Sequence, residues 1–177
     1  YFYSYFLVED NSEPINFSVP TGNFGDVYAG YLAKKIGLPI NKFVVATNQN
    51  DILHRAITNG AYNVENVLET ISPSMDIQIA SNFERLIFDL NDHSDKKTID
   101  VMKSIKEKGK YEIQKENLDK INVNFLSSRM DENEILNTIK NVYEKFDKVL
   151  DPHSAIGYGA FDKVNLKGNN IVLATAH

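Results

Sequence analysis

The stretch Ser18–Asp26, which reads Ser-Val-Pro-Thr-Gly-Asn-Phe-Gly-Asp, carries residues that could hold a phosphate group. Gly22 and Gly25 allow positive φ and a close approach of the backbone, so that successive N–H groups can converge on an anion. Thr21 and Asn23 can add side-chain donors, and a helix that follows would place its positive end at the anion. Glycines also occur in loops that bind nothing, so a purely structural loop is the alternative.

The neighbouring segments are those that a phosphate loop requires. The apolar run Ile15–Val19 predicts a short strand, Phe24–Ile36 predicts a helix that ends at Gly37, and Phe43–Ala46 predicts a second buried strand. Strand, loop, helix and strand form a βαβ unit with a parallel pair and a right-handed crossover. Ligands bind beyond the carboxyl ends of such strands, where this loop would lie. The apolar side of the helix is predicted to comprise Phe24, Tyr28, Tyr31 or Leu32, and Ile36.

The rest of the chain continues the alternation of helices and strands. The aromatic-rich run Tyr1–Val8 is expected to be the end of a buried helix or to cover a sheet. Further helices are predicted at Ile52–Thr58 with Asn50 or Asp51 as its cap, Asn82–Leu90, a segment N-capped by Thr98, Asp131–Phe146 and Pro152–Val164. Strands are predicted at Ile121–Phe125, where apolar and polar residues alternate, and at Ile171–Thr175.

Composition restricts the classes of function. The 177 residues are 42% hydrophobic and 24% charged, as in an ordinary globular protein of one domain. A net charge of −5 argues against a general affinity for nucleic acid or an anionic membrane. There is no cysteine, no apolar run long enough to cross a bilayer and no recognisable signal peptide, so a cytoplasmic location is the default. His54 and His93 lack a metal-ligand spacing, and no metal site is predicted.

Seven blocks, beginning with the glycine loop, extend in order through nearly the whole chain: Ser18–Asp26, Ala29–Pro39, Val45–Asp51, Ser72–Asp76, Ser81–Arg85, Asp151–Ala155 and Leu173–His177. Taken in this order, they resemble threonine synthase. The resemblance is weakest from Asn91 to Asn124. Threonine synthases are pyridoxal-phosphate enzymes of fold type II that convert O-phospho-L-homoserine and water to L-threonine and phosphate. The resemblance implies an α/β fold, three-layer α/β/α with a mainly parallel sheet, in which residues 1–177 form most of the large cofactor domain.

The same resemblance implies which residues would hold pyridoxal 5′-phosphate. The cofactor's phosphate would be held by Gly22, Asn23, Phe24 and Gly25, with Thr21 and Asp26 beside them. Because a carboxylate repels a phosphate unless it points away, capping of the following helix is the alternative role of Asp26. Thr175 would lie by the pyridine nitrogen, where a hydroxyl tunes the electronics of the cofactor. Its alternative role is to bond the backbone at a strand end.

Candidates for the substrate side are less specific. Asn48, Asp51 and Arg55 follow the carboxyl end of a predicted strand. Arg85 could hold a phosphate with two hydrogen bonds, although an ordinary ion pair is an equal reading of either arginine. His153 either helps to begin a helix or lies near the substrate, and the role of His177 is similarly open.

An absence limits what this chain can do by itself. In threonine synthases the lysine that forms the Schiff base lies before the glycine loop, and no lysine here stands in a matching motif. Lys34 and Lys35 lie a helix length away from the loop. The chain also opens at Tyr1 without methionine and stops at His177, before the family's Pro-Ala-Lys-Phe. We therefore expect the C-terminal part of a threonine synthase, with no catalytic residue of its own, whose partner is the missing N-terminal part.

Other classes of function remain open. One alternative is another type-II enzyme, such as a dehydratase of hydroxyamino acids. A second is a non-catalytic module that keeps a phosphate pocket or has become an interaction domain. A nucleotide-binding domain is disfavoured, because neither Gly-x-Gly-x-x-Gly nor a Walker-type Gly-Lys-Ser/Thr occurs.

Overall fold

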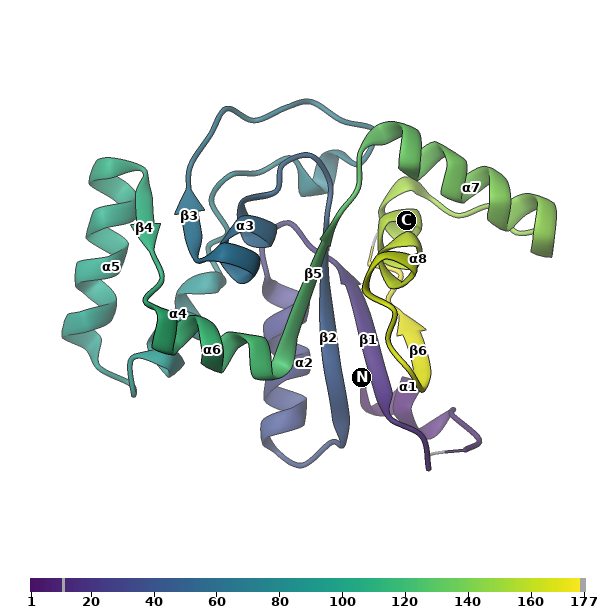
Figure 1. Ribbon diagram of the computed structural model, residues 1–177, viewed down its shortest axis with the longest axis horizontal. Coiled ribbons are helices and arrows are strands. Elements are labelled where there is room, and N and C mark those ends of the chain that lie inside the picture. The colour runs from purple at the N-terminus through teal and green to yellow at the C-terminus, as the bar shows by residue number, and fades with distance from the viewer. Residues whose placement is uncertain (11, 176–177) are drawn as a thin grey trace.

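A four-stranded parallel sheet forms the centre of the computed structural model, which describes residues 1–10 and 12–175 (Figure 1). The strands lie in the order β5-β2-β1-β6 and are β1 (Ile15–Pro20), β2 (Ile40–Thr47), β5 (Phe125–Arg129) and β6 (Asn169–Val172). All three neighbouring pairs are parallel. The βαβ unit predicted around the glycine loop is therefore confirmed.

Helices cover both faces of this sheet (Figure 1). They are α1 (Phe2–Phe6), α2 (Gly25–Lys35), α3 (Ile52–Asn59), α4 (Phe83–Leu90), α5 (Asp95–Lys108), α6 (Lys115–Asn124), α7 (Glu132–Phe146) and α8 (Pro152–Val164). A 3₁₀ turn, η1 (Pro73–Met75), precedes α4. The short strands β3 (Ala61–Asn63) and β4 (Lys110–Glu112) form a separate antiparallel pair.

Alternate side chains of the central strands enter two different cores. Phe17 and Phe43 belong to the larger core, which α2, α3, α4 and α6 complete. Val44 and Ala46 face the opposite way, into a core shared with Ile135 of α7 and several residues of α8. Strands buried on both faces explain the continuous apolar runs in the sequence. The predicted three-layer α/β/α arrangement is confirmed.

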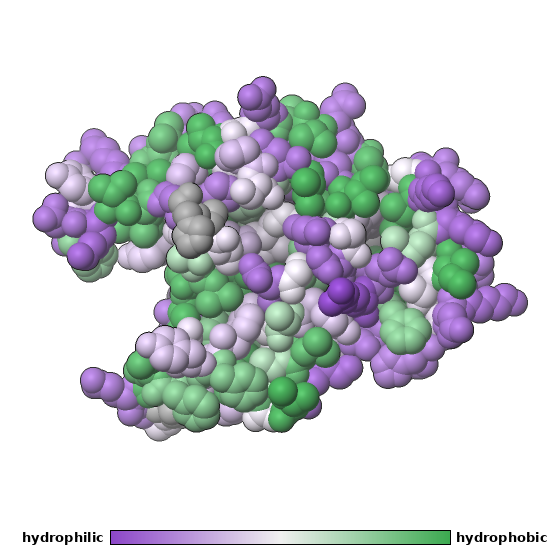
Figure 2. Space-filling view, turned by 180° about the vertical axis from the view of Figure 1, so that it is seen from behind, coloured by the Kyte–Doolittle hydropathy of each residue, from purple (hydrophilic) through white to green (hydrophobic). Residues whose placement is uncertain are grey.

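The N-terminal segment packs against the larger core through Tyr1, which is the N-cap of α1, and through the partly buried Tyr5 and Val8. The ring of Tyr1 packs 4.9 Å from that of Phe17, and its hydroxyl donates a hydrogen bond to the backbone oxygen of Asp26 at 2.6 Å. Burial, aided by the nearby Asp26 carboxylate, raises the pKa of this phenol far above its ordinary value. Phe2, Tyr3, Phe6 and Leu7 are exposed, and Figure 2 shows apolar and aromatic side chains gathered over α1. No residue of α1 is fully buried, so the expectation of a buried helix is wrong, whereas the alternative, that this run covers the sheet, is confirmed by the packing of Tyr1 on Phe17.

The buried side of α2 matches the prediction only in part. Phe24 is buried, and Tyr28 and Tyr31 pack partly buried against the core, as predicted. The fully buried residues within the helix are Val27, Gly30 and Ala33, whereas Ile36 is 75% exposed. Small residues line the buried side because the helix lies close to the sheet: an added Cβ at Gly30 would overlap the rings of Tyr1 and Phe43. Hydrophobic periodicity cannot detect such a side, since glycine and alanine carry little of the signal.

Two predicted element boundaries are wrong for local reasons. Helix α5 begins at Asp95, and the N-cap is Ser94, whose side chain accepts from the N–H of Lys97; Thr98 lies inside the helix. The strand predicted at Ile121–Phe125 is the end of α6 followed by the start of β5, and the side chain of Val123 points to solvent. Ile121 and Phe125 are four residues apart, so their spacing fits either period.

Three helix starts show how acidic residues act at these positions. Asp131 and Glu134 form a reciprocal capping box at α7, and Asp151 caps α8. The predicted starts of these two helices, at Asp131 and Pro152, are therefore confirmed to within one residue. Asp51 occupies the N-cap of α3 but makes no capping bond, because its carboxylate accepts instead from Nε of Arg55 at 2.7 Å.

The last strand ends earlier than the predicted Ile171–Thr175. Strand β6 stops at Val172, so Thr175 lies after the strand and not at its carboxyl end.

We expect Gly157→Ala to destabilise the protein by about 1–3 kcal/mol, because it overpacks the contact between α8 and the sheet. An added Cβ would lie 2.9 Å from both Pro20 Cγ and Val172 Cγ1. Urea unfolding followed by circular dichroism measures the change. Asp162→Ala, at an exposed position of α8, is the control and should change the free energy of unfolding by less than about 0.5 kcal/mol.

Candidate functional site

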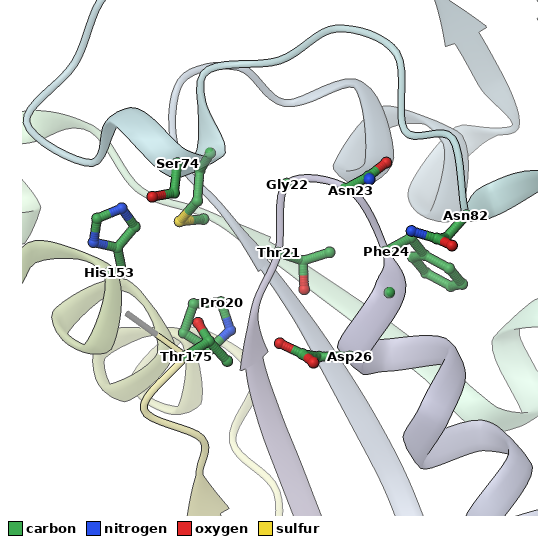
Figure 3. A pocket seen from close by; sticks show the side chains of 12 residues that line it. Pro20, Thr21, Gly22, Asn23, Phe24, Asp26, Ser74, Asn82, His153 and Thr175 are labelled. Atoms are coloured by element: carbon green, nitrogen blue, oxygen red, sulfur yellow. The ribbon is translucent and has the colours of Figure 1, made fainter. Parts of the chain in front are cut away.

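A cavity of about 260 Å³ lies where β1 turns into α2 (Figure 3). Five separate parts of the chain meet around it: the β1–α2 turn, the 3₁₀ turn η1, the start of α4, the start of α8 and the segment after β6. Its lining consists of Pro20, Thr21, Gly22, Asn23, Phe24, Gly25, Asp26, Ser74, Met75, Asn82, His153 and Thr175. The structure therefore brings together all seven residues predicted to bind the cofactor, together with His153.

The turn presents backbone donors to the cavity. The N–H of Thr21 still continues the sheet, donating to Ala46 O at 2.8 Å. From Gly22 to Asp26, no backbone N–H donates any of the hydrogen bonds found among the described residues. These groups lie at the N-terminus of α2, where the helix dipole also favours negative charge. The turn can therefore bind an anion with its main chain.

The left-handed residue of this turn is Phe24. Its backbone has φ 67° and ψ 5°, a conformation that non-glycine residues seldom adopt. The side chain is 1% exposed, and its ring packs edge-on against Phe83 with centroids 5.2 Å apart. Only the main chain of Phe24 is thus offered to a ligand. Gly22 and Gly25 do not use the positive φ that glycine allows, because neither is among the residues with positive φ.

The glycines instead permit close packing around the cavity. A Cβ on Gly22 would lie 3.0 Å from Ser74 O and 3.1 Å from Met75 Cα, both of which are backbone atoms. A Cβ on Gly25 would lie 3.3 Å from the side-chain nitrogen of Asn82. Any larger residue at position 22 would displace η1 or the turn itself. The close approach expected from the sequence is present at both positions.

The polar side chains of the turn are used mainly to hold it in place. Asn23 Oδ1 accepts hydrogen bonds from N–H and Oγ of Ser81, at 2.6 and 2.8 Å. The hydroxyl of Thr21 donates to Val19 O. Asp26 lies in the first turn of α2 and lines the cavity, and its side chain makes no capping bond. The capping role considered for Asp26 is therefore not realised.

At the start of α8, Asp151 holds His153 in a fixed orientation. One carboxylate oxygen accepts from the N–H groups of His153 and Ser154, at 2.9 and 3.2 Å, and lies 3.1 Å from Nδ1 of His153. Burial disfavours ionisation of Asp151, but the hydrogen bonds from Ser154 and His153 outweigh it and lower the pKa of the carboxyl group. Nε2 of His153 is buried without a partner among the described residues. His153 thus belongs both to a capped helix start and to the cavity.

Four other predicted residues, Asn48, Asp51, Arg55 and Arg85, lie outside the cavity lining. Asn48 is buried and donates to Ser72 Oγ and Asp76 Oδ1, which ties the segment around η1 to the end of β2. Arg55 and Asp51 form an ion pair with a second partner each. Arg85 lies 6.0 Å from the centroid of the Tyr28 ring and lines a different hollow. Their role toward substrate stays a prediction.

The other two described histidines, His54 and His93, each lie within hydrogen-bonding distance of one polar side chain. His54 faces Ser127 Oγ at 3.1 Å, and His93 faces Asp89 at 2.9 Å. The described residues contain no group of three or more histidine or acidic side chains that could hold a metal ion. None of the helices in the described part of the chain is long and apolar enough to cross a membrane. His177 lies outside the described residues.

Four lining residues, Pro20, Ser74, Met75 and Asn82, were not identified as site residues from the sequence. Each lies inside one of the blocks that carry the resemblance, namely Ser18–Asp26, Ser72–Asp76 and Ser81–Arg85. Their position in these blocks was the signal in the sequence that could have identified them as site residues. Composition and periodicity give none, because the spatial meeting of these segments depends on the whole fold.

Comparison with known proteins first defines the class. The fold superposes on a pyridoxal-phosphate-bound threonine synthase from Brucella melitensis with a TM-score of 0.95 and 42% identity, covering 99% of this chain and 38% of that one. Yeast threonine synthase superposes with a TM-score of 0.93 and 38% identity, over 100% of this chain and 39% of that one. Maize serine racemase shares the fold at a TM-score of 0.53 and 15% identity, over 91% of this chain and 42% of that one. The fold is that of the type-II pyridoxal-phosphate enzymes.

Sequence relatives then define the family. The chain is 38% identical to threonine synthase of Pseudomonas aeruginosa and 40% identical to that of Saccharomyces cerevisiae, with all of this chain aligned in both cases. No family model matches. The chain is a homologue of the threonine synthases and spans about 38% of the length of these relatives. The resemblance seen in the sequence is confirmed.

The lowered pKa of Asp151 predicts a pH-dependent contribution to stability. Its ionised form is favoured by folding, so this contribution is present above the ordinary aspartate pKa of about 3.9 and is lost as the pH falls through the lowered value. We expect Asp151→Asn to lower the free energy of unfolding by roughly 0.3–1 kcal/mol at neutral pH, since asparagine still caps but lacks the charge. Urea unfolding of both proteins from about pH 7 to about pH 2 should show the two curves converging at acidic pH. A constant difference would contradict it.

Proposed function

We propose that this chain supplies the cofactor-phosphate loop and the pyridine-side residue of a pyridoxal-phosphate-dependent threonine synthase. In that enzyme O-phospho-L-homoserine and water would give L-threonine and phosphate. The observation that carries the proposal is the set of unbonded N–H groups from Gly22 to Asp26 at the edge of the cavity. A cytoplasmic location stays a prediction from the sequence.

The residues around the cavity fit a phosphorylated pyridine cofactor. The N–H groups of the turn would hold its phosphate, and Thr175 would present a hydroxyl to the pyridine nitrogen from the same lining. When bound, the cofactor supplies an electron sink for substrate carbanions. The task of this chain is to bind and orient it, while the core behind Phe24 keeps water from the other side of the turn.

We further propose that these 177 residues are not catalytically competent alone. No lysine occurs in the lining of the cavity, within the described residues, and Lys35 is paired with Asp89 at 3.1 Å. The cavity volume of about 260 Å³ is also below the roughly 300–1,000 Å³ of most small-molecule sites. A segment from the rest of the enzyme would add the lysine that binds the cofactor covalently and would close the site. This segment is the proposed protein partner, and residues 1–177 are proposed to be most of one cofactor domain.

Binding of pyridoxal phosphate tests the proposal directly. We expect the wild-type chain to bind it reversibly, as measured by absorbance and by calorimetric titration, and we expect Gly22→Ala to weaken binding about tenfold or more, because the added methyl displaces backbone at 3.0 Å. Gly109→Asn is the matched control: asparagine tolerates its left-handed conformation, and the added Cβ meets only Val64 at 3.8 Å. Equal affinities for the wild type and Gly22→Ala would argue against a phosphate in this turn.

The proposed lack of catalysis needs a separate assay. Phosphate release from O-phospho-L-homoserine, measured with the cofactor present, should stay at the uncatalysed rate for this chain. Turnover by these residues alone would refute the proposal that the lysine comes from elsewhere. A chain that binds neither the cofactor nor phosphate would instead fit the alternative of a non-catalytic module.

A further inference from the structure

Among the described residues that line the cavity, only His153 can acquire a positive charge. The lining contains the carboxylate of Asp26 but no lysine or arginine. Ser74, Met75 and Thr175, which come from the other elements at the cavity, are uncharged. Glu134 of α7, the helix packed on α8, is paired with Lys163 at 2.6 Å. A phosphate in this cavity would therefore lie near the carboxylate of Asp26, and His153 is the one lining side chain that could carry a compensating positive charge.

The geometry of His153 leaves one ring nitrogen for a ligand. The residue is 9% exposed, and Nδ1 lies 3.1 Å from Asp151 Oδ1. An ionised carboxylate can only accept, so Nδ1 carries a proton and Nε2 is the atom whose state can change. A buried nitrogen without a partner costs free energy unless a ligand or water bonds it. Figure 3 shows the ring facing Ser74 at one end of the cavity.

We propose that His153, protonated at Nε2 and oriented by Asp151, donates a charged hydrogen bond to a phosphate group in this cavity. This inference rests on the proposed function and names a further residue of its phosphate site. The proton on Nε2 comes from solvent or from a monoanionic phosphate, whose O–H bond breaks as the N–H bond forms; no other covalent bond changes. Asp151 orients the ring, because its carboxylate lies 3.1 Å from Nδ1 and leaves Nε2 as the ring nitrogen that can bond the phosphate. The phosphate is either that of the cofactor or a second one, from a phosphorylated substrate or free phosphate.

Two substitutions separate a role in binding from a role in folding. His153→Leu removes both ring nitrogens, whereas His153→Gln keeps a neutral donor. Circular dichroism and thermal unfolding establish that each variant is folded. His54→Leu serves as the matched control, since His54 is also partly buried but bonds Ser127 and lies outside the cavity lining.

Isothermal titration at neutral pH then compares pyridoxal phosphate, pyridoxal and inorganic phosphate. We expect His153→Leu to weaken binding of a phosphate-bearing ligand about tenfold or more, with His153→Gln in between and pyridoxal unchanged within about twofold. If the cofactor's own phosphate is the partner, the affinity for pyridoxal phosphate falls. If a second phosphate is the partner, His153→Leu leaves the affinity for pyridoxal phosphate unchanged. Inorganic phosphate then binds more weakly to the His153→Leu variant than to the wild type when both proteins are saturated with pyridoxal phosphate.

The opposite results are equally definite. Unchanged affinities for every phosphate ligand overturn the inference, and so does an equal loss for pyridoxal, which would show a merely structural role. Binding of inorganic phosphate but not of pyridoxal phosphate by the wild type would refute the proposed function. The role of His153 would then be supported by weaker binding of inorganic phosphate to His153→Leu and overturned by equal binding. Binding of neither by the wild type would overturn both.

Discussion

The site depends on one backbone conformation, the left-handed turn at Phe24. Such a conformation costs a non-glycine residue on the order of 1–3 kcal/mol, and it persists only where the surroundings enforce it. Here the ring is buried between Phe83 of α4 and Phe125 of β5. Burial of a phenylalanine side chain contributes roughly 1.5–3 kcal/mol, which is enough to offset the strain. The hydrophobic core therefore fixes the direction of the N–H groups that face the cavity.

Rigid neighbours extend this control to the other side of the cavity. The carboxylate of Asp76 accepts from Asn48, Asn50 and Thr70, so partly buried hydrogen bonds tie η1 to the segment that follows β2. The side chain of Asn23 performs the same task for the segment that leads into α4. Networks of this kind are costly if one member is lost, because the remaining polar groups stay buried without partners. The positions of the cavity walls are thus specified by polar contacts and not only by apolar packing.

The local elements were predictable because their signals are local. Ile15–Val19 and Phe43–Ala46 are buried on both faces, and their apolar runs indicate parallel strands without further information. The turn that we propose to bind an anion was also visible in the sequence, since its glycines stand between a strand and a helix. The left-handed conformation of Phe24 could not be predicted from the sequence. It depends on the packing of its ring against Phe83 and Phe125, which follow it by 59 and 101 positions. Likewise, the free nitrogen of His153 results from where α8 packs, and its sequence context indicated only a helix start.

The charge distribution indicates that the main chain would do most of the binding at the proposed phosphate site. The protein carries a net charge of −5, and Asp26 adds a carboxylate to the cavity itself. Long-range attraction would therefore not concentrate a phosphate here, and backbone dipoles at close range, together with the hydrogen bond proposed for His153, would supply the affinity. Contacts inside a cavity are screened by salt much less than those between exposed charges. A site of this construction selects its ligand by fit to a fixed turn, so its affinity should depend more on the geometry around Gly22 than on ionic strength.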